Sequence, residues 1–61
     1  MDIKMMRKRK KLTQSELASM IGVSQQAVAR WEKGDSSPTS NKLPKLARAL
    51  NCKIEELYGN V

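Results

Sequence analysis

The sequence has no histidine, and its one cysteine is Cys52. Without histidine or a second cysteine, the chain can form neither a zinc finger nor an intramolecular disulfide, and histidine-based acid–base catalysis is excluded. The aromatic residues are limited to Trp31 and Tyr58, too few for the stacked platform of sheet-based single-strand binders. There is no nucleophile–base pair and no metal-binding set. We therefore predict a protein that is not an enzyme and that uses no metal, no cofactor and no small-molecule ligand.

Long apolar stretches are also absent. No run approaches the roughly 20 residues needed to cross a bilayer, and no apolar stretch follows the charged N-terminus as in a signal peptide. A single thiol fits a reducing compartment, because secreted domains of this size usually carry several disulfides. We expect a cytoplasmic protein that does not enter the membrane.

Basic residues, in contrast, are abundant. The 61 residues include 12 Lys and Arg but only 6 Asp and Glu, for a net charge of +6. The first eleven residues hold six of the basic residues and a single acid, Asp2, so most of the charge lies at one end. This balance favours nucleic acid, an acidic protein or an anionic membrane surface as the partner. The membrane surface is the least favoured, since the basic N-terminal segment has a short apolar face that the core needs.

The length allows one domain, spanning residues 1–61, and the apolar spacing predicts that it is all-α. A first short helix is expected over residues 3–10, with Asp2 as its N-cap. A second helix starts after Thr13, whose hydroxyl and the Glu16 carboxylate form a capping box. Gly22 ends this helix, because glycine adopts the left-handed conformation without steric cost.

A third helix follows almost at once, with Ser24 as its N-cap and Gly34 at its end. The linker between the second and third helices is too short for an antiparallel pair, so the two helices cross steeply as a helix-turn-helix over about residues 14–33. Val28 and Trp31 mark the buried side of the third helix. The core that the two helices share is predicted to contain Leu17, Ile21, Val23, Val28 and Trp31, with Ala18 small because the third helix crosses close to it.

A loop leads to a fourth helix, which is expected to begin near Thr39 or Ser40 so that Pro44 falls in its first turn. Asn51 is a plausible left-handed stop for this helix. A last short helix is predicted around Ile54–Tyr58. Cys52 is expected in the core, and Met5, Met6 and Met20 are expected in the core or at its fringe.

The outward face of the third helix carries an unusual set of side chains. At about 100° per residue, burial of Val28 and Trp31 leaves Gln26 and Arg30 facing outward, with Gln25 at the exposed N-terminal end. Glutamine pairs with adenine and arginine with guanine in the major groove. Gln25, Gln26 and Arg30 are therefore candidate base-reading residues.

The ordered set of motifs resembles the lambda-repressor-like, Cro/C1-type (XRE) helix-turn-helix DNA-binding domain. The resemblance covers nearly the whole chain and rests on Leu12–Ala18, Gly22–Gly34, Pro38, Leu46-Ala47, Leu50 and Ile54–Leu57. It implies a five-helix fold that binds double-stranded DNA. It also implies a phage- or bacterial-type transcriptional regulator, located at the nucleoid, that represses as a homodimer on a pseudo-palindromic operator.

The resemblance also implies roles for individual residues. Family members read bases from the positions of Gln25, Gln26 and Arg30, and bond a phosphate from the position of Gln14, where the helix N-terminus also favours an anion. The remaining candidate phosphate contacts are Lys10, Lys11, Lys33 and Ser36. An ion pair between Arg7 and Glu32 is expected to hold the third helix in place, with the arginine also available to a phosphate.

Three positions depart from the family pattern. Lys11 and Asn51 replace common glycines and are expected to be left-handed, while Lys53 replaces the usual cap of the last helix, which should fray. Family analogy places a dimer patch at Leu57 and the tail 58–61. It leaves open whether the chain is a minimal regulator or the N-terminal domain of a longer one. The alternative function on the same fold is that of an antitoxin or protein-interaction adaptor.

Overall fold

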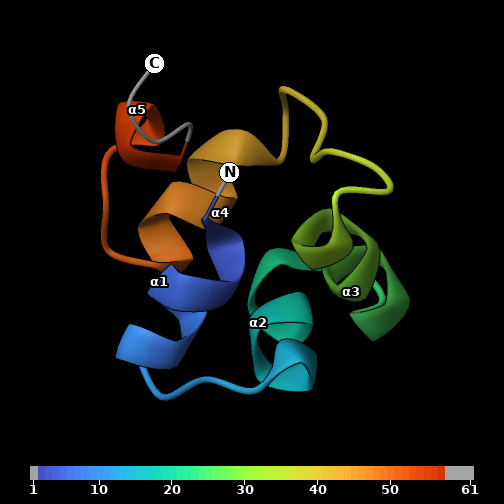
Figure 1. Ribbon diagram of the computed structural model, residues 1–61. Helices are drawn as coiled ribbons and strands as arrows, with labels where there is room; N and C mark the ends of the chain where they lie inside the picture. The colour runs from blue at the N-terminus through green and yellow to red at the C-terminus, as the bar shows by residue number, and fades with distance from the viewer. Residues whose placement is uncertain (1, 58–61) are drawn as a thin grey trace.

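The computed structural model describes residues 2–57, and all the regular secondary structure over that range is helical, as the sequence predicted (Figure 1). Two helices, α2 and α3, pack closely through the short turn at Gly22. The helix α1 lies beside α4, and α5 lies at the end of the molecule away from α3 (Figure 1). The bounds are α1 Ile3–Arg9, α2 Gln14–Ile21, α3 Gln25–Lys33, α4 Leu43–Ala49 and α5 Ile54–Leu57.

Local capping explains where α2 begins. The Glu16 amide donates to Thr13 Oγ1 at 3.0 Å, and the Thr13 amide donates to Glu16 Oε1 at 2.8 Å, so the predicted capping box is confirmed. Gly22 ends the helix at φ 75°, in the left-handed region where a side chain would be strained. An N-terminal cap such as Thr13 typically contributes about 1 kcal/mol to stability.

The third helix has the predicted ends as well. The Ala27 amide donates to Ser24 Oγ at 3.1 Å, and Gly34 closes the helix at φ 85°. The Gly34 amide donates to the carbonyls of Arg30 and Trp31, and the Asp35 amide donates to the Arg30 carbonyl at 3.0 Å, which satisfies carbonyls of the last turn.

The predicted start of the fourth helix near Thr39 or Ser40 is wrong, because α4 begins at Leu43. A helix from Ser40 would need an amide hydrogen on Pro44 to reach the Ser40 carbonyl, and proline has none. The chain instead makes a turn in which the Lys42 amide donates to the Thr39 carbonyl at 2.9 Å.

The ends of α1 and α5 also differ in detail from the predictions. Asp2 precedes α1 but its side chain caps nothing, since its ψ of 51° lies outside the extended conformation of an effective N-cap. The helix α1 ends at Arg9, one residue early. Before α5, the Lys53 amide donates to Glu56 Oε1 at 3.1 Å, which supplies half of a capping box where the usual cap is missing. Tyr58 lies outside the described residues.

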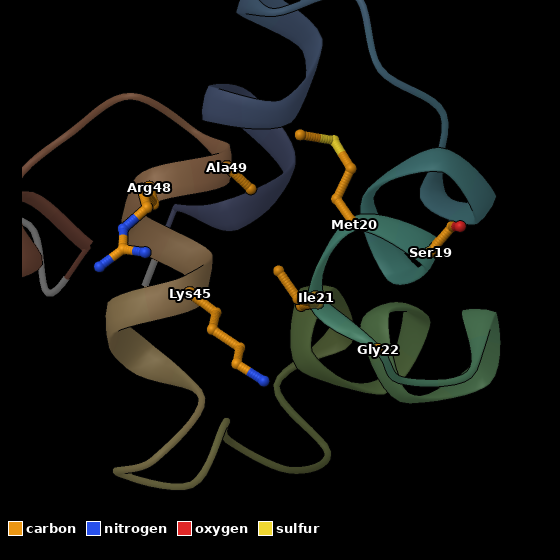
Figure 2. Close-up of a pocket in the computed structure, with 7 residues that line it drawn as sticks. All are labelled: Ser19, Met20, Ile21, Gly22, Lys45, Arg48 and Ala49. Atoms are coloured by element: carbon orange, nitrogen blue, oxygen red, sulfur yellow. The ribbon is translucent and has the colours of Figure 1, made fainter.

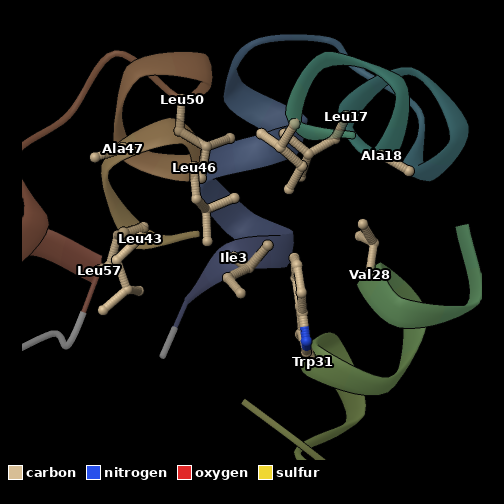
Figure 3. Packing of buried hydrophobic residues seen from close by; sticks show 11 residues of the cluster. Ile3, Leu17, Ala18, Val28, Trp31, Leu43, Leu46, Ala47, Leu50 and Leu57 are labelled. Atoms are coloured by element: carbon tan, nitrogen blue, oxygen red, sulfur yellow. The ribbon is translucent and has the colours of Figure 1, made fainter. Parts of the chain in front are cut away.

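The core lies between the helices, and every helix contributes to it (Figure 3). Ile3, Leu46 and Leu57 are fully buried, and removing each such side chain from water contributes about 1.5–3 kcal/mol. Trp31 is buried from α3, as predicted. The complete cluster is Ile3, Leu17, Ala18, Ile21, Val28, Trp31, Leu43, Leu46, Ala47, Leu50 and Leu57.

Some predicted core residues lie outside this cluster. Val23 and Cys52 are half-buried and pack against its edge, as does Met6. The prediction that Met5 and Met20 belong to the core or its fringe is wrong, because their side chains are 47% and 56% exposed. Each lies on the solvent-facing side of its helix, while Ile3 of α1 and Leu17 and Ile21 of α2 face the core.

Candidate nucleic-acid interface

The candidate recognition helix α3 is held by its buried side. Val28 is fully inaccessible and Trp31 is 9% exposed, which fixes the rotation of α3 on the core. Gln25, Gln26 and Arg30 are exposed on the side turned to solvent. These residues therefore have the accessibility that base reading needs.

An ion pair joins α1 to the C-terminal half of α3, as predicted from the resemblance. Arg7 Nε donates to Glu32 Oε2 at 2.6 Å, and Arg7 Nη2 donates to Glu32 Oε1 at 3.1 Å. The two side chains are only 10% and 5% exposed. A two-bonded arginine–carboxylate pair fixes orientation as well as distance, so the pair sets the position of α3 relative to α1.

Gln14 belongs to the same network. Its Nε2 donates to Glu32 Oε1 at 3.0 Å, which ties the first residue of α2 to α3. The sequence reasoning missed this bond, because the two residues are eighteen positions apart and no local pattern links them. The Gln14 backbone amide, at the start of α2, remains directed out of the helix, where a phosphate would be favoured.

The charges of this network stabilise each other. Burial of Glu32 raises the pKa of its carboxyl. The hydrogen bonds from Arg7 and Gln14, together with the charges of Arg7 and Lys4, lower this pKa by more than burial raises it, so the net pKa lies below its ordinary value. The hydrogen bond to Glu32 in turn raises the pKa of Arg7. Both groups are therefore charged at neutral pH.

Arg7 also holds the turn between α1 and α2. Its Nη1 donates to the Leu12 carbonyl at 2.8 Å, while the Leu12 amide donates back to the Arg7 carbonyl at 3.1 Å. The turn carries Lys10 and Lys11, both exposed, and Lys11 has the expected left-handed backbone with φ 58°. Two candidate phosphate contacts thus lie on a turn that is anchored to the ion pair.

The remaining phosphate candidates follow α3. Lys33 is exposed in the last turn of the helix, and Ser36 is exposed in the loop beyond Gly34. Pro38 is buried in that loop, which the sequence did not predict, and its burial fixes the loop to the body of the protein. Asp35 lies between the two candidates and reduces the positive charge of the loop.

Two other kinds of site are absent from residues 2–57. No group of three or more cysteine or acidic side chains lies together where a metal ion could be held. No helix in that range is both long and apolar enough to cross a membrane.

A steeply crossed helix pair with an exposed polar second helix defines the class of helix-turn-helix proteins. Residues 3–57 match the family described as helix-turn-helix, and the chain belongs to this family. The family predicted from the sequence, in its Cro/C1-type form, is thereby confirmed.

The chain is similar to known regulators. It is 36% identical over 55 residues to the repressor protein C2 of Salmonella phage P22. The aligned segment covers 90% of this chain and 26% of that protein. It is 42% identical over 50 residues to the transcriptional regulator DicA of Escherichia coli, covering 82% of this chain and 37% of that protein. The chain thus spans well under half of the length of these two relatives.

A solved structure is similar over almost the whole chain. It is a crystal structure of the P22 c2 repressor in complex with a synthetic operator, with a TM-score of 0.87 and 36% identity. The match covers 90% of this chain and 83% of that one. The five-helix fold predicted from the sequence is therefore confirmed.

Proposed function

We propose that the protein binds double-stranded DNA at specific sequences and represses transcription. The observation that carries the proposal is the solvent-facing set of Gln25, Gln26 and Arg30 on a helix whose opposite side is locked into the core. A helix of this kind fits the major groove, where base edges are accessible. The similarity to the P22 c2 repressor in complex with its operator supports the same assignment.

The base-reading step uses hydrogen bonds from these side chains. The side-chain amides of Gln25 and Gln26 each carry a donor for adenine N7 and an acceptor for the adenine N6 amino group in the major groove. The Arg30 guanidinium donates to the two acceptors of guanine, O6 and N7. Each good bidentate pair is worth about 1–3 kcal/mol of discrimination against the wrong base. The sequence read by the protein is thus set by α3.

Phosphate contacts set the register of α3 on the duplex. Gln14, Lys10, Lys11, Lys33 and Ser36 are proposed for this role, since they are polar or basic side chains on segments joined to α3. Arg7 and Glu32 keep those segments together and act through position rather than through contact with bases. The net charge of +6 adds general attraction for the phosphate backbone.

Repression follows from occupancy. A homodimer would place two copies of α3 in successive major grooves about 34–36 Å apart, on a pseudo-palindromic operator. A bound dimer excludes polymerase from an overlapping promoter. Leu57, part of the dimer patch proposed by family analogy, is itself fully buried in the core, and the rest of that patch, residues 58–61, lies outside the described residues.

Selection from a random duplex pool at about 150 mM salt tests the proposal. We expect enrichment of an inverted repeat whose half-sites are one helical turn apart. Enrichment without a motif, lost steeply as salt rises, would show electrostatic attraction alone and would overturn the assignment of sequence-specific binding. A single unrepeated half-site would overturn the dimer.

A further inference from the structure

A groove lies between α2 and α4 on a surface that shares no residue with the candidate DNA interface (Figure 2). Its volume is about 520 Å³ and it is open to solvent. The lining residues are Ser19, Met20, Ile21 and Gly22 on one side and Lys45, Arg48 and Ala49 on the other.

The wall contributed by α2 has one accessible apolar side chain, that of Met20. Met20 is the most exposed large hydrophobic residue of residues 2–57, at 56%, and it extends toward the side of the groove where Ala49 lies (Figure 2). An unbranched methionine adapts its shape to different apolar partners. The position of Met20 away from the core therefore provides an apolar anchor point that folding does not use.

The wall contributed by α4 is cationic. Lys45 and Arg48 are exposed and stand one helical turn apart on the same face as Ala49. Lys45 extends from α4 toward the Gly22 turn, whereas the Arg48 guanidinium lies on the side of α4 away from α2 (Figure 2). No acidic residue lines the groove, and within residues 2–57 the one ion pair is that of Arg7 and Glu32. Neither cation forms an ion pair within the described residues, and Arg48 also borders the hollows on the α5 side that contain Glu55 and Glu56.

We propose that this groove binds an amphipathic helix of a partner protein that carries acidic side chains beside apolar ones. A groove between two helices suits a third helix laid along it. Two cations one turn apart match two carboxylates at the same spacing, and Met20 and Ala49 receive the adjoining apolar side chains. Because no residue of α3 lines the groove, the partner and a DNA duplex can be bound at the same time. The proposal does not depend on the DNA-binding function.

A titration followed by amide NMR tests the proposal on the full chain. The probe is a synthetic helical peptide of about 14 residues with Glu and Leu repeated at one-turn spacing. The matched control peptide has Gln at each Glu position. We expect saturable shifts of the amide signals of residues 19–22 and 45–49, and about tenfold weaker binding of the control peptide, because the charge contacts are lost.

Variants of the protein sharpen the test. Lys45→Glu with Arg48→Glu should weaken the acidic peptide about tenfold, whereas Lys8→Glu with Arg9→Glu makes the same change in net charge on exposed α1 positions and should leave the affinity within about twofold. A Met20→Ser variant should also weaken binding, through loss of the apolar contact. All five positions are exposed, so the variants should retain the fold.

Four results would overturn the proposal. Absence of saturable shifts would remove the site, and shifts confined to residues 25–30 would show that the peptide occupies the DNA interface instead. Shifts of residues 19–22 and 45–49 on dilution without peptide would show that a second copy fills the groove. If the Lys45–Arg48 double variant weakened duplex binding but left the peptide affinity unchanged, the two cations would be phosphate contacts.

Discussion

The Glu32 carboxylate accepts two hydrogen bonds from the Arg7 guanidinium, and the pair joins the first helix to the candidate recognition helix. Both side chains are almost fully buried. Arg7 also bonds the Leu12 carbonyl, and Glu32 also accepts from Gln14. The position of α3 on the body of the protein thus depends on this one pair as well as on Val28 and Trp31.

Removal of either partner should destabilise the fold strongly. Arg7→Ala leaves the Glu32 charge buried without its cation, and Glu32→Ala leaves the arginine in the same state. Each change is expected to lower the free energy of unfolding by about 3–5 kcal/mol. Urea denaturation measures this, with the exposed Lys8→Ala on the same helix as a control that should change stability by less than about 0.5 kcal/mol. A loss below about 1 kcal/mol for Arg7→Ala would contradict the structural role.

Stability should also fall in acid through Glu32. The pKa of its carboxyl in the folded protein lies below the ordinary value of 4.5, so the unfolded chain binds the proton more readily. The stabilisation is therefore present above pH 4.5 and is lost as the pH falls through the lower folded value. Denaturation midpoints measured between pH 7 and pH 3 should drop less steeply for Glu32→Gln than for the native protein. Glu55→Gln, at an exposed position, is the control, and equal slopes for all three proteins would refute the assignment.

The parts of this structure that the sequence predicted are those set by neighbouring residues. Thr13 and Glu16 define the start of α2 by themselves, and Gly22 and Gly34 define two helix ends. The predicted start of α4 is wrong because Pro44 has no amide hydrogen and cannot donate to the Ser40 carbonyl. The turn made by the loop before α4 then decides where the helix begins. The exposure of Met20 was not predicted, because helical spacing alone does not show which side of α2 the other helices cover.

The candidate site divides in the same way. The outward direction of Gln25, Gln26 and Arg30 followed from the spacing of Val28 and Trp31 on one helix. The Arg7–Glu32 pair came only from the family resemblance, since the residues are 25 positions apart. The bond from Gln14 to Glu32 needed the packed structure, because it depends on how α2 crosses α3.

The left-handed residue between α1 and α2 should be a site of easy stabilisation. Lys11 has φ 58°, a conformation that disfavours a residue with a β-carbon by about 1–2 kcal/mol and leaves glycine unstrained. After the greater entropy of unfolded glycine is subtracted, Lys11→Gly should raise the free energy of unfolding by about 0.5–1 kcal/mol. Thermal denaturation measures it. Lys11→Ala keeps the strain and removes the charge, so a gain of the same size from alanine would show that charge, not backbone, was responsible.

The phosphate candidates should reveal themselves through salt. Once a selected duplex is available, Lys10→Ala and Lys33→Ala should each weaken binding by a similar factor on all sequences. Each should also reduce the slope of log affinity against log salt by about 0.9, the loss of one phosphate contact. Fluorescence anisotropy at several salt concentrations measures both effects. An unchanged slope would remove that lysine from the interface.

The most direct test of the central claim compares the base preferences of the native protein and Arg30→Ala. Affinities are measured for the selected duplex and for each of its single base-pair substitutions, with Lys33→Ala as a control. We predict that Arg30→Ala loses about 1–3 kcal/mol of discrimination at one symmetry-related base-pair position and keeps the rest of the profile, while Lys33→Ala keeps the whole profile at lower affinity. An Arg30→Ala profile identical to that of the native protein at every position would contradict base reading by Arg30 from the exposed face of α3.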